Sequence, residues 1–194
     1  MSHFCQLNRI ISERLFKTST GYQRSIMRIE TEELINELWD NIYAAAYSIT
    51  GNRMDAEDAA QDAFVRYHMH NKQFEGKEHI RAWLFKTAIN RAKDLTRSLW
   101  KKNKVSFEEY MENAGEAEDS SEALIRREES IRLTSSVFSL PEKYRIVIHL
   151  YYYEEYSAVE IARILGITEA NVRKRLSRAR EMLRHELSEE FEND

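Results

Sequence analysis

The sequence has few of the residues that build disulfide-bonded, β-rich or membrane-spanning proteins. Its single cysteine, Cys5, excludes an internal disulfide framework and suits a reducing compartment. One proline and five glycines are too few for the many turns of a β-sandwich or barrel. No apolar run reaches the roughly 18–20 residues that a membrane-spanning helix needs, and the basic first 28 residues lack the apolar stretch of a signal peptide. We therefore expect a mostly helical, cytoplasmic protein without membrane insertion.

Charge is segregated along the chain rather than spread evenly. The 29 Lys and Arg face 33 Asp and Glu, for a net charge of −4. Residues 77–104 and 173–184 are strongly basic, whereas residues 106–125 are acidic and contain no Lys or Arg. Two basic segments predict two contacts with a polyanion such as nucleic acid. The alternative is that these segments are solvated helix faces.

The acidic middle segment also predicts the division into domains. Its polar composition, with Asn-Ala-Gly and Asp-Ser-Ser sequences, is typical of a linker. The segment 1–28 is either a real arm or lies upstream of a true start at Met27. The expected division is an N-terminal extension 1–28, a first domain 29–104, a flexible acidic linker 105–130, a second domain 131–188 and an acidic tail 189–194. A linker of this kind permits either a compact or an open pair of domains.

The first domain has the apolar periodicity of three helices. The first helix ends at Gly51, the second begins near Asp55 with acidic residues in its first turn, and the third runs from about Ile80 to Leu99. A basic stripe with one amide follows a different side of the third helix, where it can contact phosphates and one base edge. That stripe consists of Lys86, Asn90, Lys93 and Arg97.

The second domain begins with a helix at Leu140-Pro141-Glu142, because proline is tolerated in a first turn. The positions expected on its apolar face are Tyr144, Val147, Ile148 and Tyr151. We expect the tyrosine triplet 151–153 to lie in the core and at its packing edge rather than to form a stacking platform.

A helix-turn-helix is predicted directly after this helix. Ser157 and Glu160 fit a capping box, Gly166 ends the short helix that follows, and Thr168 caps the next one. The second helix of such a motif can enter a major groove. Its outward residues are Arg173, Lys174, Ser177 and Arg178. The alternative is an ordinary helical hairpin whose basic face is exposed to solvent and binds no DNA.

No residue pattern points to catalysis or to a bound metal. His68 and His70 are two residues apart, so on a helix they face away from each other. No phosphate loop, nucleophile-and-base set or cysteine cluster is present in the sequence. We therefore expect neither an enzyme nor a cofactor or metal site.

Three motifs together resemble one family. DAEDAAQDAF at Asp55–Phe64 resembles the D-A-E-D-x-x-Q-x-x-F core of sigma-factor region 2. IRAWLFKTAINR at Ile80–Arg91 resembles the W-L-x-x-I-A-x-N segment that follows it, and Leu140–Arg180 resembles region 4. Their order and spacing over roughly residues 34–187 are similar to those of the extracytoplasmic-function sigma factors of bacterial RNA polymerase.

The resemblance implies an all-α fold of two small helical domains and a role in promoter recognition. Region 2 would bind the β′ clamp helices of core polymerase, and then recognise and melt the −10 element with the loop 71–79 and the helix after it. Region 4 would read the −35 element and contact the β flap, while the acidic linker would thread toward the active centre. The resemblance also implies an anti-sigma partner.

Each implied contact corresponds to specific residues of this chain. The implied core-polymerase contacts are Asp55, Asp58, Gln61 and Asp62; the −10 contacts are Phe74 (as a stacking ring), Lys86, Asn90, Lys93 and Arg97; the −35 contacts are Thr168, Arg173, Lys174, Ser177 and Arg178. The competing interpretation is a stand-alone helix-turn-helix regulator that binds operator DNA without polymerase. That interpretation leaves the two N-terminal motifs without a function.

Overall fold

The computed structural model describes residues 28–69, 73–98 and 133–192, and every regular element in these ranges is helical. The predicted arm 1–28, except for its last residue, and the predicted linker 105–130 lie outside the described residues. None of the described helices is long and apolar enough to cross a bilayer. The helices are α2 (Thr31–Thr50), α3 (Arg53–Met69), α4 (Lys77–Ser98), a helix over 133–139, α7 (Glu142–Ile148), the π-helix η1 (His149–Tyr153), α8 (Ala158–Leu165) and α9 (Glu169–Glu192).

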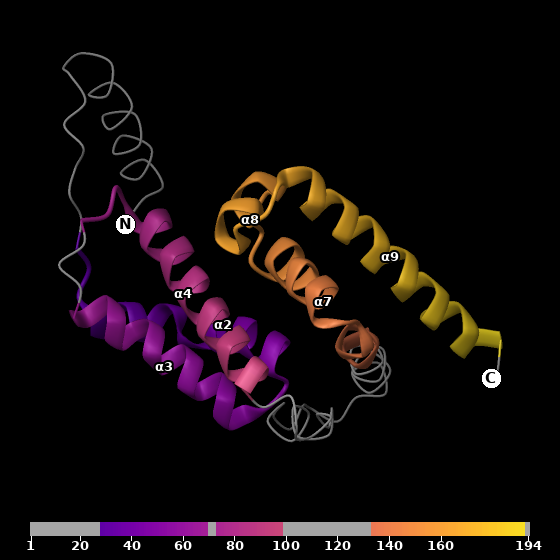
Figure 1. The fold of residues 1–194 in the computed structure, drawn as a ribbon, viewed down its shortest axis with the longest axis horizontal. Helices are drawn as coiled ribbons and strands as arrows, with labels where there is room; N and C mark the ends of the chain where they lie inside the picture. Colours follow the sequence, from indigo (N-terminus) through magenta and orange to yellow (C-terminus); the bar gives the residue numbers. More distant parts are fainter. Residues whose placement is uncertain (1–27, 70–72, 99–132, 193–194) are drawn as a thin grey trace, which may run out of the picture.

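The helices α2, α3 and α4 form an N-terminal bundle (Figure 1). As predicted, α2 ends at Gly51, which adopts a left-handed φ of 55° and donates its N–H to the carbonyl of Tyr47. The α3 helix begins two residues before the expected Asp55, because the side chain of Asn52 accepts the N–H of Asp55 at 3.0 Å. The apolar residues that recur at helical spacing along α2 are all buried: Leu34, Leu38, Ile42, Ala45, Ala46 and Ile49.

The helix over 133–139, α7, η1, α8 and α9 form a C-terminal bundle. The π-turn in η1 changes the register of the apolar face, so Leu150 is fully buried while Tyr151 is 37% exposed. Of our expectation for Tyr151–Tyr153, the place in the core is therefore wrong, whereas the place at its packing edge agrees with their partial exposure. Two of these rings instead contact the Arg180 side chain, whose Nε donates to the hydroxyl of Tyr152 at 2.9 Å.

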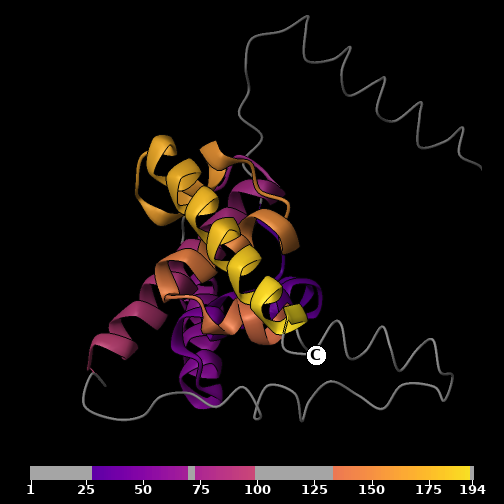
Figure 2. The ribbon, with the colours of Figure 1, turned by 90° about the vertical axis from the view of Figure 1, so that its right-hand side faces the viewer.

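The two bundles pack against each other and share one continuous apolar core. Two aromatic pairs join them: Phe85 of α4 with Tyr156, and Tyr47 of α2 with Phe138, at ring-centroid distances of 5.6 and 5.5 Å. Figure 1 shows α9 on the side of the C-terminal bundle away from the N-terminal bundle, and Figure 2, seen from that side, shows it in front of the other helices. Of the two arrangements that the sequence left open, the described residues adopt the compact one.

Candidate nucleic-acid interface

The helix-turn-helix is built by local contacts that the sequence predicts correctly. The side chain of Glu160 accepts the N–H of Ser157 at 2.9 Å, and the hydroxyl of Ser157 accepts the N–H of Glu160. Gly166 ends α8 with a φ of 66°, and Thr168 Oγ1 accepts the N–H of Asn171 at 3.2 Å to cap α9. The hydrogen bonds from Ser157 lower the pKa of Glu160. Each of these contacts joins residues only a few positions apart. Together they set where α8 begins and ends and where α9 begins.

The outward face of α9 is open to solvent. The apolar residues Val172, Leu176 and Ala179 are buried beneath it. The face itself holds two ion pairs, Arg173 with Glu169 at 2.6 Å and Arg178 with Glu181 at 2.9 Å. The exposed residues of this face are Arg173, Lys174, Ser177 and Arg178. Both pairs are exposed and can exchange a carboxylate for a phosphate or a base edge at small energetic cost.

The basic stripe of α4 is less uniformly open than that of α9. Lys86, Asn90 and Arg97 are exposed, whereas Lys93 is half-buried. Burial lowers the pKa of Lys93; the charge of Glu142 on α7 opposes this effect, and that of Arg175 on α9 adds to it. The ammonium group of Lys93 is therefore influenced by charges on the C-terminal bundle as well as on its own helix.

Phe74 does not have the exposure that its expected stacking contact requires. Its side chain is only 2% exposed and lies among Tyr67, Trp83 and His79, with ring centroids 5.4–5.7 Å away. No face of the ring is free for a nucleic-acid base in this conformation. The expectation for Phe74 is thus corrected to a packing role, in which the ring anchors the loop before α4.

The predicted polar contacts of α3 lie on the side opposite its buried alanines. Asp58 and Gln61 are exposed, and Asp55 is partly exposed near the N-terminus of the helix. Asp62 is partly buried, and its carboxylate pairs with Arg66 at 2.7 Å. The exposed Met54, Val65 and Met69 are also on α3, so the helix offers apolar as well as acidic groups to a partner.

The described residues contain no group of three or more His, Cys, Asp or Glu that could hold a metal ion. His68 contacts the hydroxyl of Thr31 through Nδ1 at 3.1 Å, whereas His70 lies outside the described residues.

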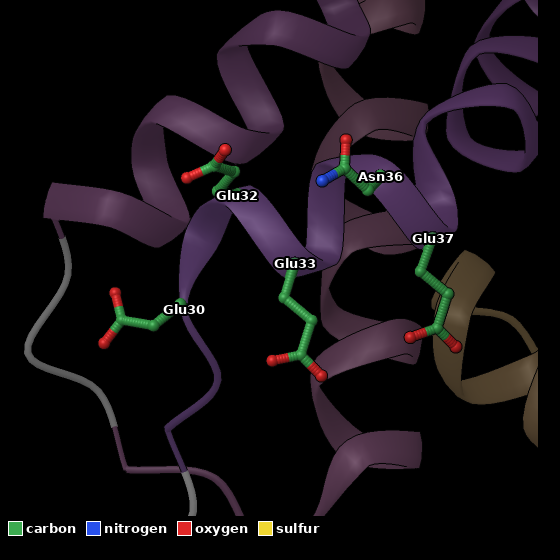
Figure 3. Close-up of a pocket in the computed structure, with 5 residues that line it drawn as sticks. All are labelled: Glu30, Glu32, Glu33, Asn36 and Glu37. Atoms are coloured by element: carbon green, nitrogen blue, oxygen red, sulfur yellow. The ribbon is translucent and has the colours of Figure 1, made fainter.

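An open hollow at the start of α2 is strongly acidic (Figure 3), a charge that does not suit nucleic acid. Its lining residues are Glu30, Glu32, Glu33, Asn36 and Glu37.

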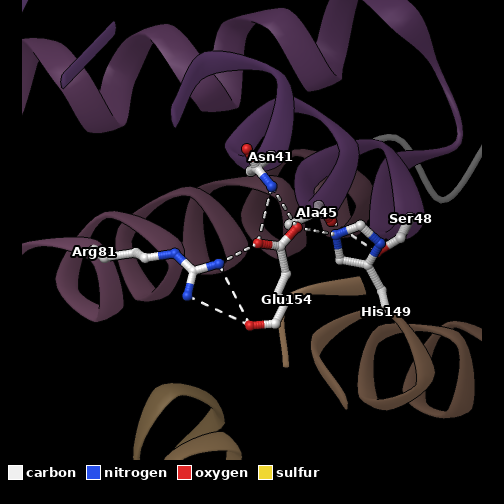
Figure 4. Close-up of polar contacts among 6 residues, drawn as sticks. All are labelled: Asn41, Ala45, Ser48, Arg81, His149 and Glu154. Carbon is white, nitrogen blue, oxygen red and sulfur yellow. Dashed lines mark hydrogen bonds and ion pairs between the residues drawn. The ribbon is translucent and has the colours of Figure 1, made fainter. Parts of the chain in front are cut away.

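A buried carboxylate between the bundles was not predicted from the sequence. The side chain of Glu154 is 2% exposed and accepts from Arg81 Nη2 at 2.7 Å and from Asn41 Nδ2 at 3.1 Å (Figure 4). His149 Nε2 lies 3.3 Å from Glu154 Oε1, at an ion-pair distance but outside good hydrogen-bond geometry. Burial alone would raise the pKa of Glu154, but His149, Asn41 and Arg81 together lower it. The sequence has no signal that distinguishes Glu154 from the exposed Glu155 beside it.

Comparisons with known proteins agree on one family. The Sigma-70 region 2 model matches residues 34–102, and the Sigma-70 region 4 model matches residues 133–183. The chain is 30% identical to the ECF RNA polymerase sigma factor SigW of Bacillus subtilis, over 93% of this chain and 98% of SigW. It is 29% identical to SigM of the same organism, over 79% of this chain and 92% of SigM.

Solved structures of other proteins share this fold. CnrH, in complex with the cytosolic domain of CnrY, is 26% identical and covers 87% of this chain and 90% of its own, with a TM-score of 0.57. The sigma factor RpoE of Bartonella quintana, in complex with the anti-sigma factor NepR, is 20% identical and covers 81% of this chain, with a TM-score of 0.54. The second likeness supports the fold alone.

Proposed function

Because this chain belongs to the extracytoplasmic-function sigma factors of RNA polymerase, we propose that it binds core polymerase and directs promoter-specific transcription initiation. The observation that carries this function is the match to SigW along nearly the whole length of both chains, with regions 2 and 4 in order. The relatives are sigma factors and not enzymes, so we assign nucleotidyl transfer to the polymerase and no catalytic group to this chain. We place the chain in the cytoplasm with that polymerase.

The contact with core polymerase is assigned to the exposed face of α3. Asp58 and Gln61 are one helical turn apart, and both project into solvent. Carboxylates and an amide on one face complement a basic coiled coil and can direct its docking. Asp55 and the Asp62–Arg66 pair flank these two residues and complete the proposed surface.

The contacts with promoter DNA are assigned to two helices. On α9, Arg173, Lys174, Ser177 and Arg178 face the major groove of the −35 element, while Thr168 places the helix N-terminus beside a phosphate. On α4, the −10 element is contacted by Lys86, Asn90, Lys93 and Arg97. The family resemblance implies an anti-sigma partner, and the solved relative CnrH forms a complex with the cytosolic domain of CnrY, so an anti-sigma protein is proposed as a further partner.

Binding to core RNA polymerase tests the proposed function. The unmodified chain should bind core tightly, and an Asp58→Ala/Gln61→Ala variant should bind at least about tenfold more weakly. The matched control is Glu33→Ala/Asn36→Ala, which removes an acid and an amide with the same spacing from the exposed face of α2. Tight binding to promoter DNA without any affinity for core would contradict the proposal and favour the stand-alone regulator.

A further inference from the structure

The tyrosine triplet of η1 is a surface feature that the proposed function does not use. Tyr151 is 37% exposed, and Tyr152 and Tyr153 are 53% and 55% exposed. Tyr153 stacks on the ring of His149 at a centroid distance of 5.5 Å. Tyr151 and Tyr152 form an edge-to-face pair at 5.0 Å, and both contact the side chain of Arg180 on α9. Two exposed tyrosines are thus committed to a single arginine.

The tyrosine pair restricts the orientation of the Arg180 guanidinium. Its Nε donates to the hydroxyl of Tyr152 at 2.9 Å, and its central carbon lies 5.5 and 5.7 Å from the ring centroids of Tyr151 and Tyr152. A guanidinium is attracted to aromatic faces, and a hydrogen bond from Nε adds a directional contact. Because this hydrogen bond uses only Nε, the terminal nitrogens of Arg180 keep their N–H groups for another acceptor.

The hydrogen-bond partner of Arg180 is neutral, unlike those of two other arginines on α9. Arg173 pairs with Glu169 at 2.6 Å, and Arg178 pairs with Glu181 at 2.9 Å, so an incoming phosphate must displace a carboxylate from each. In the described part of the chain, no carboxylate lies at ion-pair distance from Arg180. A phosphate therefore meets an uncompensated positive charge at Arg180, on a side chain whose orientation is already restricted.

Arg180 extends the stripe of α9 that holds two of the proposed −35 contacts. Arg173, Ser177 and Arg180 are spaced four and three residues apart, so they share one side of the helix, and all three are exposed. The hydroxyl of Tyr152 accepts a hydrogen bond from Arg180 and keeps its own hydrogen, which it can donate to an oxygen of the same phosphate. One phosphate can thus receive hydrogen bonds from α9 and from η1.

From these contacts we infer that Tyr152 is a positioning residue, which holds Arg180 as a phosphate contact at the edge of the proposed −35 interface. The identity of the DNA element rests on the proposed function, whereas the phosphate contact itself requires only duplex DNA. Phosphates carry no direct sequence information, so the pair adds affinity and helps to set the register of α9 without selecting bases.

The first test measures binding of the full-length chain to a short fluorescent DNA duplex of mixed sequence, over a series of salt concentrations. Polymerase is not needed, because the outward face of α9 is exposed in the free chain. Arg180→Ala should weaken binding about tenfold and reduce the slope of log K against log salt by about 0.9. Arg180→Lys should keep the slope but bind about threefold more weakly than wild type, because an ammonium group lacks the planar fork.

The second test separates positioning from a structural role. Tyr152→Phe keeps the ring but removes the hydroxyl, and it should weaken duplex binding about threefold. Tyr153→Phe removes a similarly exposed hydroxyl from the neighbouring residue and should leave binding unchanged. The Tyr152→Phe effect should largely disappear in the Arg180→Ala background, because the two residues act as a unit. It should persist in an Arg184→Ala background, which removes an exposed arginine one turn further along α9.

Three results would overturn the phosphate contact or the positioning role. The phosphate contact fails if Arg180→Ala binds the duplex as tightly as wild type, or if the unmodified chain does not bind it at low salt. The positioning role fails if Tyr152→Phe weakens binding equally in the Arg180→Ala and Arg184→Ala backgrounds. Each result is distinct from a failure of the proposed function, which is measured separately as binding to core polymerase.

Discussion

The two basic helices, α4 and α9, look alike in sequence but differ in their surroundings. Each carries Lys or Arg on one stripe, with a polar uncharged residue among them. On α9, Lys174 is exposed, while on α4 its counterpart Lys93 is half-buried and influenced by charges from the other bundle. Periodicity identifies which side of a helix is polar, but it does not show whether a second domain covers that side.

The largest effect is expected from breaking the packing between the two bundles. Phe85 is fully buried and packs edge-on against Tyr156 of the other bundle. Phe85→Ala should lower the free energy of unfolding by about 3–5 kcal/mol, through lost burial and the cavity left behind. Urea unfolding measures this change, with Val65→Ala on the half-exposed outer side of α3 as the control, expected within about 0.5 kcal/mol of wild type. A decrease in the free energy of unfolding below about 1 kcal/mol for Phe85→Ala would contradict the close packing of the two bundles at this contact.

The open face of α9 should be sensitive to side-chain removal in the DNA complex. Arg173→Ala should weaken promoter binding by the polymerase complex by about 1–3 kcal/mol and relax the preference at one base pair. Arg184→Ala, which removes an exposed charge further along α9, is the control and should weaken binding without changing sequence preference. Competition with promoter fragments altered at single positions measures both effects. Equal loss across all fragments for Arg173→Ala would show a phosphate contact rather than base readout.

The helix-turn-helix should show a pH dependence that comes from its capping box. The pKa of Glu160 is lowered from the ordinary value of 4.5 by hydrogen bonds from Ser157. Stability from this carboxylate is therefore fully present above that ordinary value and is lost as the pH falls through the lowered folded value. Because Glu160 is exposed, the difference from Glu160→Gln should be below about 1 kcal/mol at pH 6 and should disappear near pH 2. Urea unfolding between pH 2 and pH 6 measures this difference in the free energy of unfolding. A difference that grows as the pH falls would contradict the prediction.

The smallest effect is expected in the loop between Glu154 and α8. Glu155 has a left-handed φ of 57°, a conformation that strains a residue with a side chain. Glu155→Gly relieves this strain but increases the freedom of the unfolded chain, so we expect a net stabilisation of about 0.5 kcal/mol. Thermal unfolding measures it beside Glu155→Ala, which keeps the strain. A Glu155→Gly variant less stable than Glu155→Ala would show that the left-handed conformation costs no measurable free energy of folding.

The sequence predicted those features that depend on residues close together in the chain. The capping box of Ser157 and Glu160, the stop at Gly166 and the cap at Thr168 each rest on a contact within a few residues, and all are confirmed. The all-α architecture and the family were likewise predicted, because the motifs occur in a characteristic order.

The features that were not predicted depend on distant residues or on a change of helical register. The burial of Phe85 results from packing against Tyr156, and that of Glu154 from Asn41, which is 113 residues away in the chain. The exposure of Tyr151 follows from a π-turn that helical periodicity does not reveal. Phe74 was assigned from its place in a loop, but loop aromatics also anchor loops to the core.

The most direct measurement of the central claim is transcription reconstituted from purified core RNA polymerase, this chain and a library of bacterial genomic fragments. Mapping the 5′ ends of the transcripts should reveal discrete start sites that appear only when core and chain are both present. Those start sites should share two upstream sequence elements, one for each basic helix. Transcripts with the same 5′ ends in the presence and absence of the chain, together with specific DNA binding by the chain alone, would contradict the account.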